Sequence, residues 1–268
     1  MQTLDFQGKK VAFYQNGTKG VPLVFVHGFC EDSSLWEEFL EPFTDEYQII
    51  RIDLPGFGNS EPVENISIAG MSERLLAVLE HLKIQKFIYI GHSMGGYAGL
   101  EIVKKVGNQL LGFGMFHSHP FADTAEKKAG RDKSVEFIRR NGHELFVKQF
   151  IPGLFAQDFA KSNTFLVDKL IHRASRNPQY VITGALEAMR DRPDNSEVLK
   201  NIKCPVLFII GQLDQSIPFE ISLAQTHLPA VGDIHILPNV GHMGMFKAQK
   251  ETQGIVKNFV RFCLENAK

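Results

Sequence analysis

A single serine, Ser93, stands between glycines in the segment GHSMGG, with Gly91 two residues before it and Gly95 two residues after it. An apolar run at residues 86–90 precedes this segment, and a helical pattern from Tyr97 follows it. A G-x-S-x-G segment between a strand and a helix is typical of a nucleophile elbow, whose glycines let strand and helix pack closely around a strained serine. This setting predicts that Ser93 is a nucleophile.

A serine hydroxyl is a poor nucleophile unless a base removes its proton. In this setting the partners are expected in the chain order Ser, Asp, His. Asp214 follows the apolar run at 205–210 in GQLDQSIP, and His242 follows the run at 233–237 in PNVGHMGMF. An aspartate at such a place is also a common turn or helix cap. Because Ser93 and His242 are present, we expect Asp214 to orient the histidine.

Backbone N–H groups near the serine have a further task, since the oxyanion of an acyl-transfer intermediate needs such donors. Met94, directly after the serine, supplies one amide. The segment VFVHGFC supplies another at Phe29, where Gly28 lets the chain turn in. We therefore expect Phe29 and Met94 to form the oxyanion hole, with His27 and His92 bracing the two turns rather than carrying protons.

The elements that must position these residues alternate between short apolar runs and longer amphipathic stretches. Runs rich in Val, Ile, Leu and Phe predict strands, most of them covered on both faces, at residues 21–27, 47–54, 86–90, 110–116, 205–210 and 233–237. Apolar stripes predict helices at 67–82, 97–106 and 252–264. The alternation indicates a parallel sheet with helices on both sides, and segments 4–6 and 10–14 are expected to form an antiparallel edge.

Residues 119–195 break this alternation. The region has no predicted strand, only helical patterns at 125–140, 144–154, 163–175 and 179–190. A stretch of about 75 residues between two core strands is far too long for an ordinary loop. We therefore expect a core domain of residues 1–118 and 196–268, and a helical cap, or lid, of residues 119–195 over the strand ends.

The composition argues against several classes of binding partner, including nucleic acids and membranes. The chain of 268 residues has 29 basic and 30 acidic residues, and no basic stripe favours a nucleic acid. No apolar run approaches the roughly 18 residues of a membrane span, and the first ten residues lack the apolar core of a signal peptide. The three scattered cysteines match neither a disulfide framework nor a zinc site. We expect a cytoplasmic monomer or homodimer without a metal, acting on a small-molecule substrate.

Residues near the predicted turns and in the predicted cap are candidates for the substrate pocket: Cys30, His119, Phe121, Phe150, Phe155, Arg190 and Met243. Structural alternatives stay open for them. Cys30 also fits a buried, inert thiol, the phenylalanines fit helix packing, and His119 fits a structural histidine. Arg190, with Arg192, fits either an anion-binding site or surface salt bridges. The mixed charges of residues 127–133 indicate a solvated helix face.

Five segments occur in the order found in the α/β-hydrolase superfamily: HGF at 27–29, DLPGFGNS at 53–60, GHSMGG at 91–96, GQLD at 211–214 and VGH at 240–242. The chain resembles this family over nearly its whole length. The resemblance implies an α/β-hydrolase fold with a mostly parallel eight-stranded sheet and a helical cap after the sixth strand. It also implies that no cofactor is needed, and that Ser93, Asp214 and His242 are nucleophile, acid and base.

The expected activity is hydrolysis of a small, largely apolar carboxylic ester, thioester or lactone through an acyl-enzyme on Ser93. Dehalogenases and epoxide hydrolases of this fold use an aspartate at that position, which argues against those reactions. Two alternatives stay open. The capped layout is similar to that of C–C bond hydrolases that act on meta-cleavage diketones, and some members of the fold keep the triad as ligand receptors or signalling modules.

Overall fold

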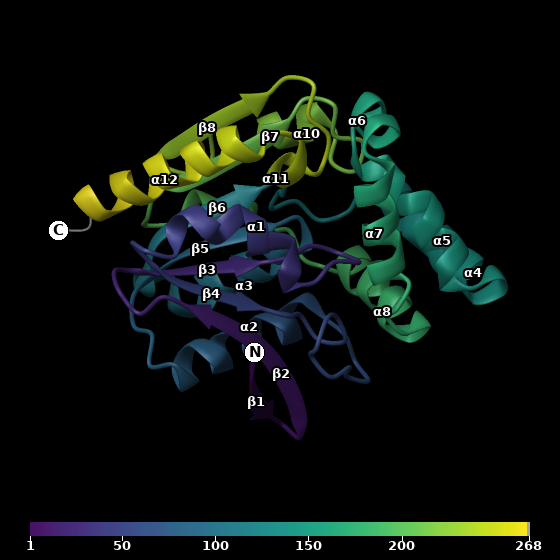
Figure 1. Ribbon diagram of the computed structural model, residues 1–268, viewed down its shortest axis with the longest axis horizontal. Coiled ribbons are helices and arrows are strands. Elements are labelled where there is room, and N and C mark those ends of the chain that lie inside the picture. The colour runs from purple at the N-terminus through teal and green to yellow at the C-terminus, as the bar shows by residue number, and fades with distance from the viewer. Residues whose placement is uncertain (267–268) are drawn as a thin grey trace.

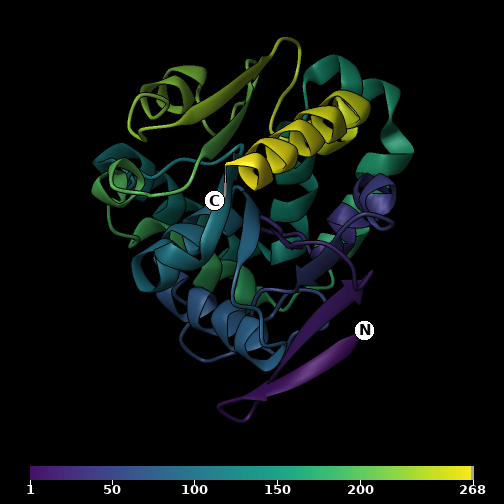
Figure 2. The same cartoon turned by 90° about the vertical axis from the view of Figure 1, so that its left-hand side faces the viewer.

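The computed structural model describes residues 1–266 (Figure 1). The strands form one eight-stranded sheet in the order β1-β2-β4-β3-β5-β6-β7-β8. They are β1 (Gln2–Phe6), β2 (Lys9–Asn16), β3 (Pro22–Val26), β4 (Gln48–Ile52), β5 (Phe87–His92), β6 (Leu110–Phe116), β7 (Val206–Gly211) and β8 (Gly232–Leu237). β2 runs antiparallel to β1 and β4, and all other neighbours are parallel. Figure 2 shows the β1–β2 ribbon and β8 at opposite margins of the sheet.

Helices cover both faces of the sheet. The α-helices of residues 1–266 are α1 (Glu37–Leu40), α2 (Ile68–His81), α3 (Met94–Val106), α4 (Ala125–Asn141), α5 (His143–Phe150), α6 (Gln157–Ser162), α7 (Thr164–Ala174), α8 (Gln179–Arg190), α9 (Ser196–Lys200), α10 (Phe219–Ala224), α11 (Gly244–Lys247) and α12 (Gln249–Glu265). Helices α2 and α3 pack together on one face, and α1 and α12 lie on the other (Figure 1). The α2 helix begins at a capping serine, Ser67, whose hydroxyl accepts the Gly70 N–H at 3.0 Å.

The central strands are apolar on both faces because helices cover both. Every residue of β5 and β7 is buried. The polar residues predicted to do chemistry lie in the turns that follow three strands: Ser93 after β5, Asp214 after β7 and His242 after β8. Since the carboxyl ends of parallel strands meet at one edge of a sheet, the fold gathers these residues there.

The predicted α/β-hydrolase fold is confirmed, including the eight-stranded, mostly parallel sheet. Three helix boundaries differ from the expectation by three residues or more. Helix α12 begins at Gln249 and not at residue 252. Helix α3 begins at Met94 and not at Tyr97, because the elbow leads straight into the helix although its first turn holds two weak helix formers, Gly95 and Gly96. The helix predicted at 144–154 ends at Phe150 and continues as a 3-10 turn, since Pro152 cannot extend an α-helical ladder.

Only helices connect β6 to β7. The segment between these strands holds α4 to α9, including α6, which the sequence pattern had not indicated. Figure 1 shows α4 to α8 grouped beside one end of the sheet. We call residues 119–195 the helical insertion; its status as a separate cap domain stays a prediction. Within residues 1–266, no helix is both long and apolar enough to cross a lipid bilayer.

Candidate active site

Ser93 occupies a sharp turn between β5 and α3. Its backbone has φ 49° and ψ −114°, a left-handed conformation that is costly for a residue with a side chain. The surroundings hold it there: the Ser93 N–H donates to the Phe116 carbonyl at 3.0 Å, and the Ser118 hydroxyl donates to the Ser93 carbonyl at 2.8 Å. This geometry is that of a nucleophile elbow.

Two glycines allow this turn to close. A Cβ atom on Gly91 would lie 2.5 Å from the Gly95 carbonyl carbon, and a Cβ atom on Gly95 would lie 2.6 Å from the Val26 carbonyl oxygen. Both contacts involve backbone, which cannot move aside as a side chain can. Glycine at these positions is therefore what lets β5, α3 and β3 approach one another around Ser93.

His242 and Asp214 form a buried acid–base pair. The His242 Nδ1 atom lies 2.6 Å from Asp214 Oδ2, and both side chains are almost fully buried. The other carboxylate oxygen of Asp214, Oδ1, accepts the N–H groups of Ser216 at 2.8 Å and Ile217 at 2.9 Å. Asp214 thereby directs one oxygen at the imidazole and leaves His242 Nε2 free for chemistry.

The pKa of Asp214 lies below its ordinary value. Burial alone would raise it, but the attraction and hydrogen bond of His242 outweigh burial, helped by His117 and the Ile217 N–H. The His117 ring lies 3.8 Å from Asp214 Oδ2, and burial holds the pKa of His117 well below its ordinary value. Asp214 is therefore a carboxylate near neutral pH, the form that can stabilise an imidazolium on His242.

Ser93 and His242 line the same cavity, which has a volume of about 100 Å³. Within residues 1–266 the Ser93 hydroxyl makes no hydrogen bond, so the link between Ser93 and His242 stays a prediction. Apo hydrogen bonds of this kind are often long and shorten only when substrate is bound. We call this space the serine cavity.

Two backbone amides near the serine are free to bind an oxyanion. In the described part of the chain, neither the Phe29 N–H nor the Met94 N–H has an acceptor. His27 braces the Phe29 loop: its Nδ1 lies 2.8 Å from the Gly28 carbonyl, and its Nε2 accepts the Leu54 N–H at 2.9 Å. These contacts fit the expected bracing role of His27 and the expected oxyanion hole.

A buried carboxylate that the sequence analysis overlooked, Glu31, joins the two sides of the site. Glu31 Oε2 accepts the Gly28 N–H at 2.8 Å and lies 2.9 Å from His92 Nδ1, while His92 Nε2 lies 2.9 Å from the His242 carbonyl. Burial alone would raise the pKa of Glu31 and lower that of His92. Their mutual attraction outweighs burial, so the pKa of Glu31 is lowered and that of His92 raised. The contacts of His92 with Glu31 and with the His242 carbonyl fit the bracing role predicted for it.

The wall of the serine cavity is mostly apolar. Its apolar side chains are Phe29, Phe150, Leu154, Leu186, Met189 and Ile217. The insertion supplies four of them, since Phe150 and Leu154 lie at the end of α5 and in the turn after it, and Leu186 and Met189 lie in α8. The cavity is therefore enclosed jointly by the core and the helical insertion.

Two cations of α4, Lys127 and Arg131, also line the cavity. Arg131 is bonded to Asp123, which also accepts from Arg192 at 2.7 Å. Lys127 Nζ donates to the Ser216 carbonyl at 3.1 Å and has no carboxylate within salt-bridge distance in residues 1–266. Arg131 and Arg192 thus share the carboxylate of Asp123, and Lys127 adds a third positive charge, so this group of four side chains has a net positive charge. Residues 127–130, 132 and 133 are exposed, as the predicted solvated face requires, and Arg131 is half-buried.

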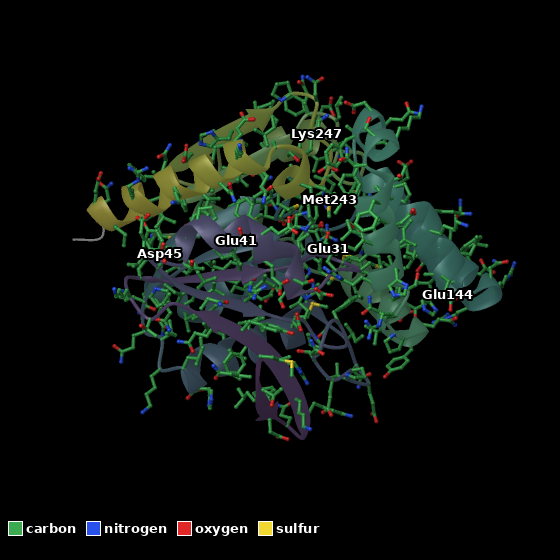
Figure 3. All side chains as sticks on the ribbon, viewed as in Figure 1. Glu31, Glu41, Asp45, Glu144, Met243 and Lys247 are labelled. Atoms are coloured by element: carbon green, nitrogen blue, oxygen red, sulfur yellow. The ribbon has the colours of Figure 1, made fainter. Side chains whose placement is uncertain are left out.

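Of the seven pocket candidates, Phe150 lines the serine cavity. Cys30 and Met243 line a small separate hollow beside Glu31. Figure 3 shows Glu31 and Met243 where the core meets the helical insertion, far from Glu144 at the insertion's outer end. Burial raises the pKa of the Cys30 thiol well above its ordinary value, which fits the inert role left open for it.

The structure places the other four candidates outside the lining of this cavity. Arg190 is bound to Asp132 at 2.6 Å and to Asp191 at 2.7 Å, so its charge is already paired. Phe155 is buried and stacks on Phe159. Phe121 and His119 lie against each other, with ring centroids 5.8 Å apart.

His119 carries a testable consequence for stability. Burial and the neighbouring Arg192 lower its pKa from 6.5 to about 3. Below pH 6.5 the unfolded chain binds a proton on His119 that the folded protein excludes, so acid favours unfolding. From His119 alone, the free energy of unfolding should fall by about 1.4 kcal/mol per pH unit between roughly pH 6 and pH 4. Urea unfolding across this range measures the slope, and H119Q should reduce it.

The exposed His227 is a matched control, and H227Q should leave the slope unchanged. An H119Q protein with the wild-type slope would show that His119 takes up its proton in the folded state.

Among residues 1–266, no group of three or more His, Cys, Asp or Glu side chains is arranged to hold a metal ion. The three cysteines are buried and unpaired.

Known proteins share this architecture. The sequence profile of a family described as "alpha/beta hydrolase fold" matches residues 21–111. The solved structure of a thermophilic esterase from Thermogutta terrifontis, with malate bound, superposes with a TM-score of 0.91 at 25% identity, covering 98% of this chain and 99% of that one. The chain has the α/β-hydrolase fold and is similar to members of the α/β-hydrolase superfamily.

Curated α/β hydrolases are similar over most of the chain. A 3-oxoadipate enol-lactonase of Acinetobacter baylyi is 27% identical over 212 residues, which cover 78% of this chain and 77% of the relative. A 2-succinyl-6-hydroxy-2,4-cyclohexadiene-1-carboxylate synthase of an Enterobacter species is 29% identical over 233 residues, covering 84% and 86%. These names describe the relatives and not this chain.

Proposed function

We propose that this α/β hydrolase cleaves a small carboxylic ester or lactone through an acyl-enzyme on Ser93. The observation that carries the proposal is the 2.6 Å contact of His242 with Asp214 at the wall of the cavity that Ser93 also lines. The lactonase and esterase among the similar proteins support the same reaction class. The apolar wall suits a small acyl or ring substrate.

In this mechanism Ser93 Oγ attacks the substrate carbonyl while His242 Nε2 takes the serine proton. Asp214 holds the imidazole by its Nδ1–H and stabilises the imidazolium. The amides of Phe29 and Met94 bind the oxyanion, a contribution of about 3–4 kcal/mol for each donor. His242 then returns the proton to the departing oxygen. A water activated in the same way releases the acid and restores Ser93.

The substrate we propose carries a carboxylate in addition to the ester or lactone group. Lys127 Nζ has only a carbonyl partner, and the cluster around it has a net positive charge. A substrate carboxylate would give Lys127 the charged partner that it lacks. The names of the two curated relatives support this choice, since one acts on an oxoadipate lactone and the other forms a cyclohexadiene carboxylate.

Lys127→Met is expected to raise KM about tenfold for a carboxylated lactone, equivalent to about 1.4 kcal/mol, because one charge-assisted hydrogen bond is lost. The kcat value should stay close to that of the wild type, since Lys127 does not touch the reacting atoms. The measurement compares 5-oxotetrahydrofuran-2-carboxylate with the neutral γ-valerolactone, following acid release in a pH-stat. KM for the neutral lactone should not change.

Lys128→Met is the matched control, because Lys128 is the next residue of α4, is exposed and does not line the cavity. Equal effects of Lys127→Met on both lactones would refute the carboxylate contact. Absence of hydrolysis of either lactone and of p-nitrophenyl esters by the wild type would refute the reaction class itself.

A further inference from the structure

Strand β8 is a free edge of the sheet. It pairs with β7 on one side only and stands last in the strand order. Figure 1 shows it along one margin of the molecule, away from α4 and α8 of the helical insertion.

The backbone of β8 directs alternate residues toward and away from β7. The carbonyls of Val231 and Leu237 accept from β7 and the residue after it, Val206 N–H at 2.9 Å and Gln212 N–H at 3.1 Å. Because residues alternate along a strand, Gly232, Ile234 and Ile236 direct their N–H and C=O groups outward. In residues 1–266 no strand pairs with these outward groups.

The side chains of this edge are apolar and unprotected. Ile234 and Ile236 are each 43% exposed, and the neighbouring helix α10 exposes Leu223 to the same extent. Natural sheets protect such edges with lysine, proline or a bulge. β8 contains neither residue, and its register with β7 runs without a shift. An edge of this kind invites pairing with another strand.

The charged side chains on the other face of β8 indicate which strand could pair with this edge. Asp233 and His235 point to the same face of β8, with Nε2 and Oδ1 2.9 Å apart. If two β8 strands pair antiparallel about a two-fold axis through Ile234, Asp233 of each copy lies opposite the partner's His235. These are non-hydrogen-bonded positions, where the side chains approach most closely. An axis through Asp233 would instead oppose two like charges.

We propose that β8 pairs antiparallel with β8 of a second copy of this chain, centred on Ile234, so that one continuous sheet crosses a symmetric dimer. Gly232, Ile234 and Ile236 exchange backbone hydrogen bonds across the axis, and the isoleucines become buried between the copies. The interface is isologous, as expected for a two-fold dimer.

The test is the mass of the protein in solution by sedimentation equilibrium at micromolar concentrations. The wild type should have twice the 30.2 kDa of one chain. Ile234→Lys should give a single chain, because it places two lysines against each other at the axis. Phe165→Lys is the matched control, since Phe165 is 84% exposed on α7, and this variant should remain a dimer.

A charge-swapped pair tests the register. Asp233→Arg alone should weaken the dimer, because two arginines then face two histidines. Adding His235→Glu should restore it, because opposite charges meet again across the axis. A cooperative thermal transition in each variant shows that the fold is intact. A monomeric wild type, an Ile234→Lys variant that stays dimeric, or a double variant no more dimeric than Asp233→Arg would each overturn the proposal.

Discussion

Ser93→Ala is expected to reduce kcat for p-nitrophenyl butyrate by about 10⁴–10⁶-fold, because the change removes the hydroxyl on which we propose that the acyl-enzyme forms. The change removes one oxygen from a turn that is held by backbone contacts to Phe116 and Ser118. The fold and the cavity should therefore be preserved. Steady-state release of p-nitrophenol measures the loss.

Ser216 provides the matched control for Ser93, because it is another serine in the lining of the serine cavity. Its roles in the site are played by backbone atoms: its N–H donates to Asp214, and its carbonyl accepts from Lys127. Ser216→Ala should retain nearly the wild-type rate. A Ser93→Ala variant with unchanged turnover would end the nucleophile assignment.

Asp214→Asn should reduce kcat by about 10⁴-fold through the wrong histidine tautomer. The N–H groups of Ser216 and Ile217 already occupy Oδ1, so the amide oxygen of the introduced asparagine will keep those bonds. The NH₂ group of that side chain must then face His242 Nδ1, which becomes an acceptor. The proton moves to Nε2, and this nitrogen can no longer take the proton of Ser93. Burst and steady-state kinetics with the same ester measure the effect.

Asp168→Asn is the control for the substitution itself, because it makes the same carboxylate-to-amide change at an exposed position of α7. It should leave kcat unchanged. Histidine side-chain NMR gives a second measurement, since His242 should carry its proton on Nδ1 in the wild type and on Nε2 in the variant. An Asp214→Asn protein that kept most of the wild-type rate would mean that another group orients His242.

The parts of the site carried by short sequence segments were predictable. The glycine spacing around Ser93 follows from close backbone contacts, so a tight turn leaves a local signature. Asp214 and His242 follow apolar strands, and the parallel sheet gathers the ends of such strands at one edge. Strand β8 was predictable as a strand, but its exposed face follows from its place at the end of the sheet order.

The walls of the cavity were less predictable because they depend on how helices of the insertion pack. Lys127 looks like any charged residue on a polar helix, and only the placement of α4 brings it to the cavity. From the sequence, Arg190 could have formed an anion-binding site. In the structure its guanidinium is paired with Asp132, which is far away in sequence. Glu31 carried no recognisable signal, since its partner His92 lies 61 residues away.

The most direct test of the central claim is covalent labelling of the serine. Incubation with a small alkyl fluorophosphonate, followed by mass spectrometry of the intact protein and its peptides, should give one adduct per chain, located on Ser93. The Asp214→Asn variant should label far more slowly. An adduct on another residue, or an unlabelled protein that still hydrolyses esters, would contradict the account.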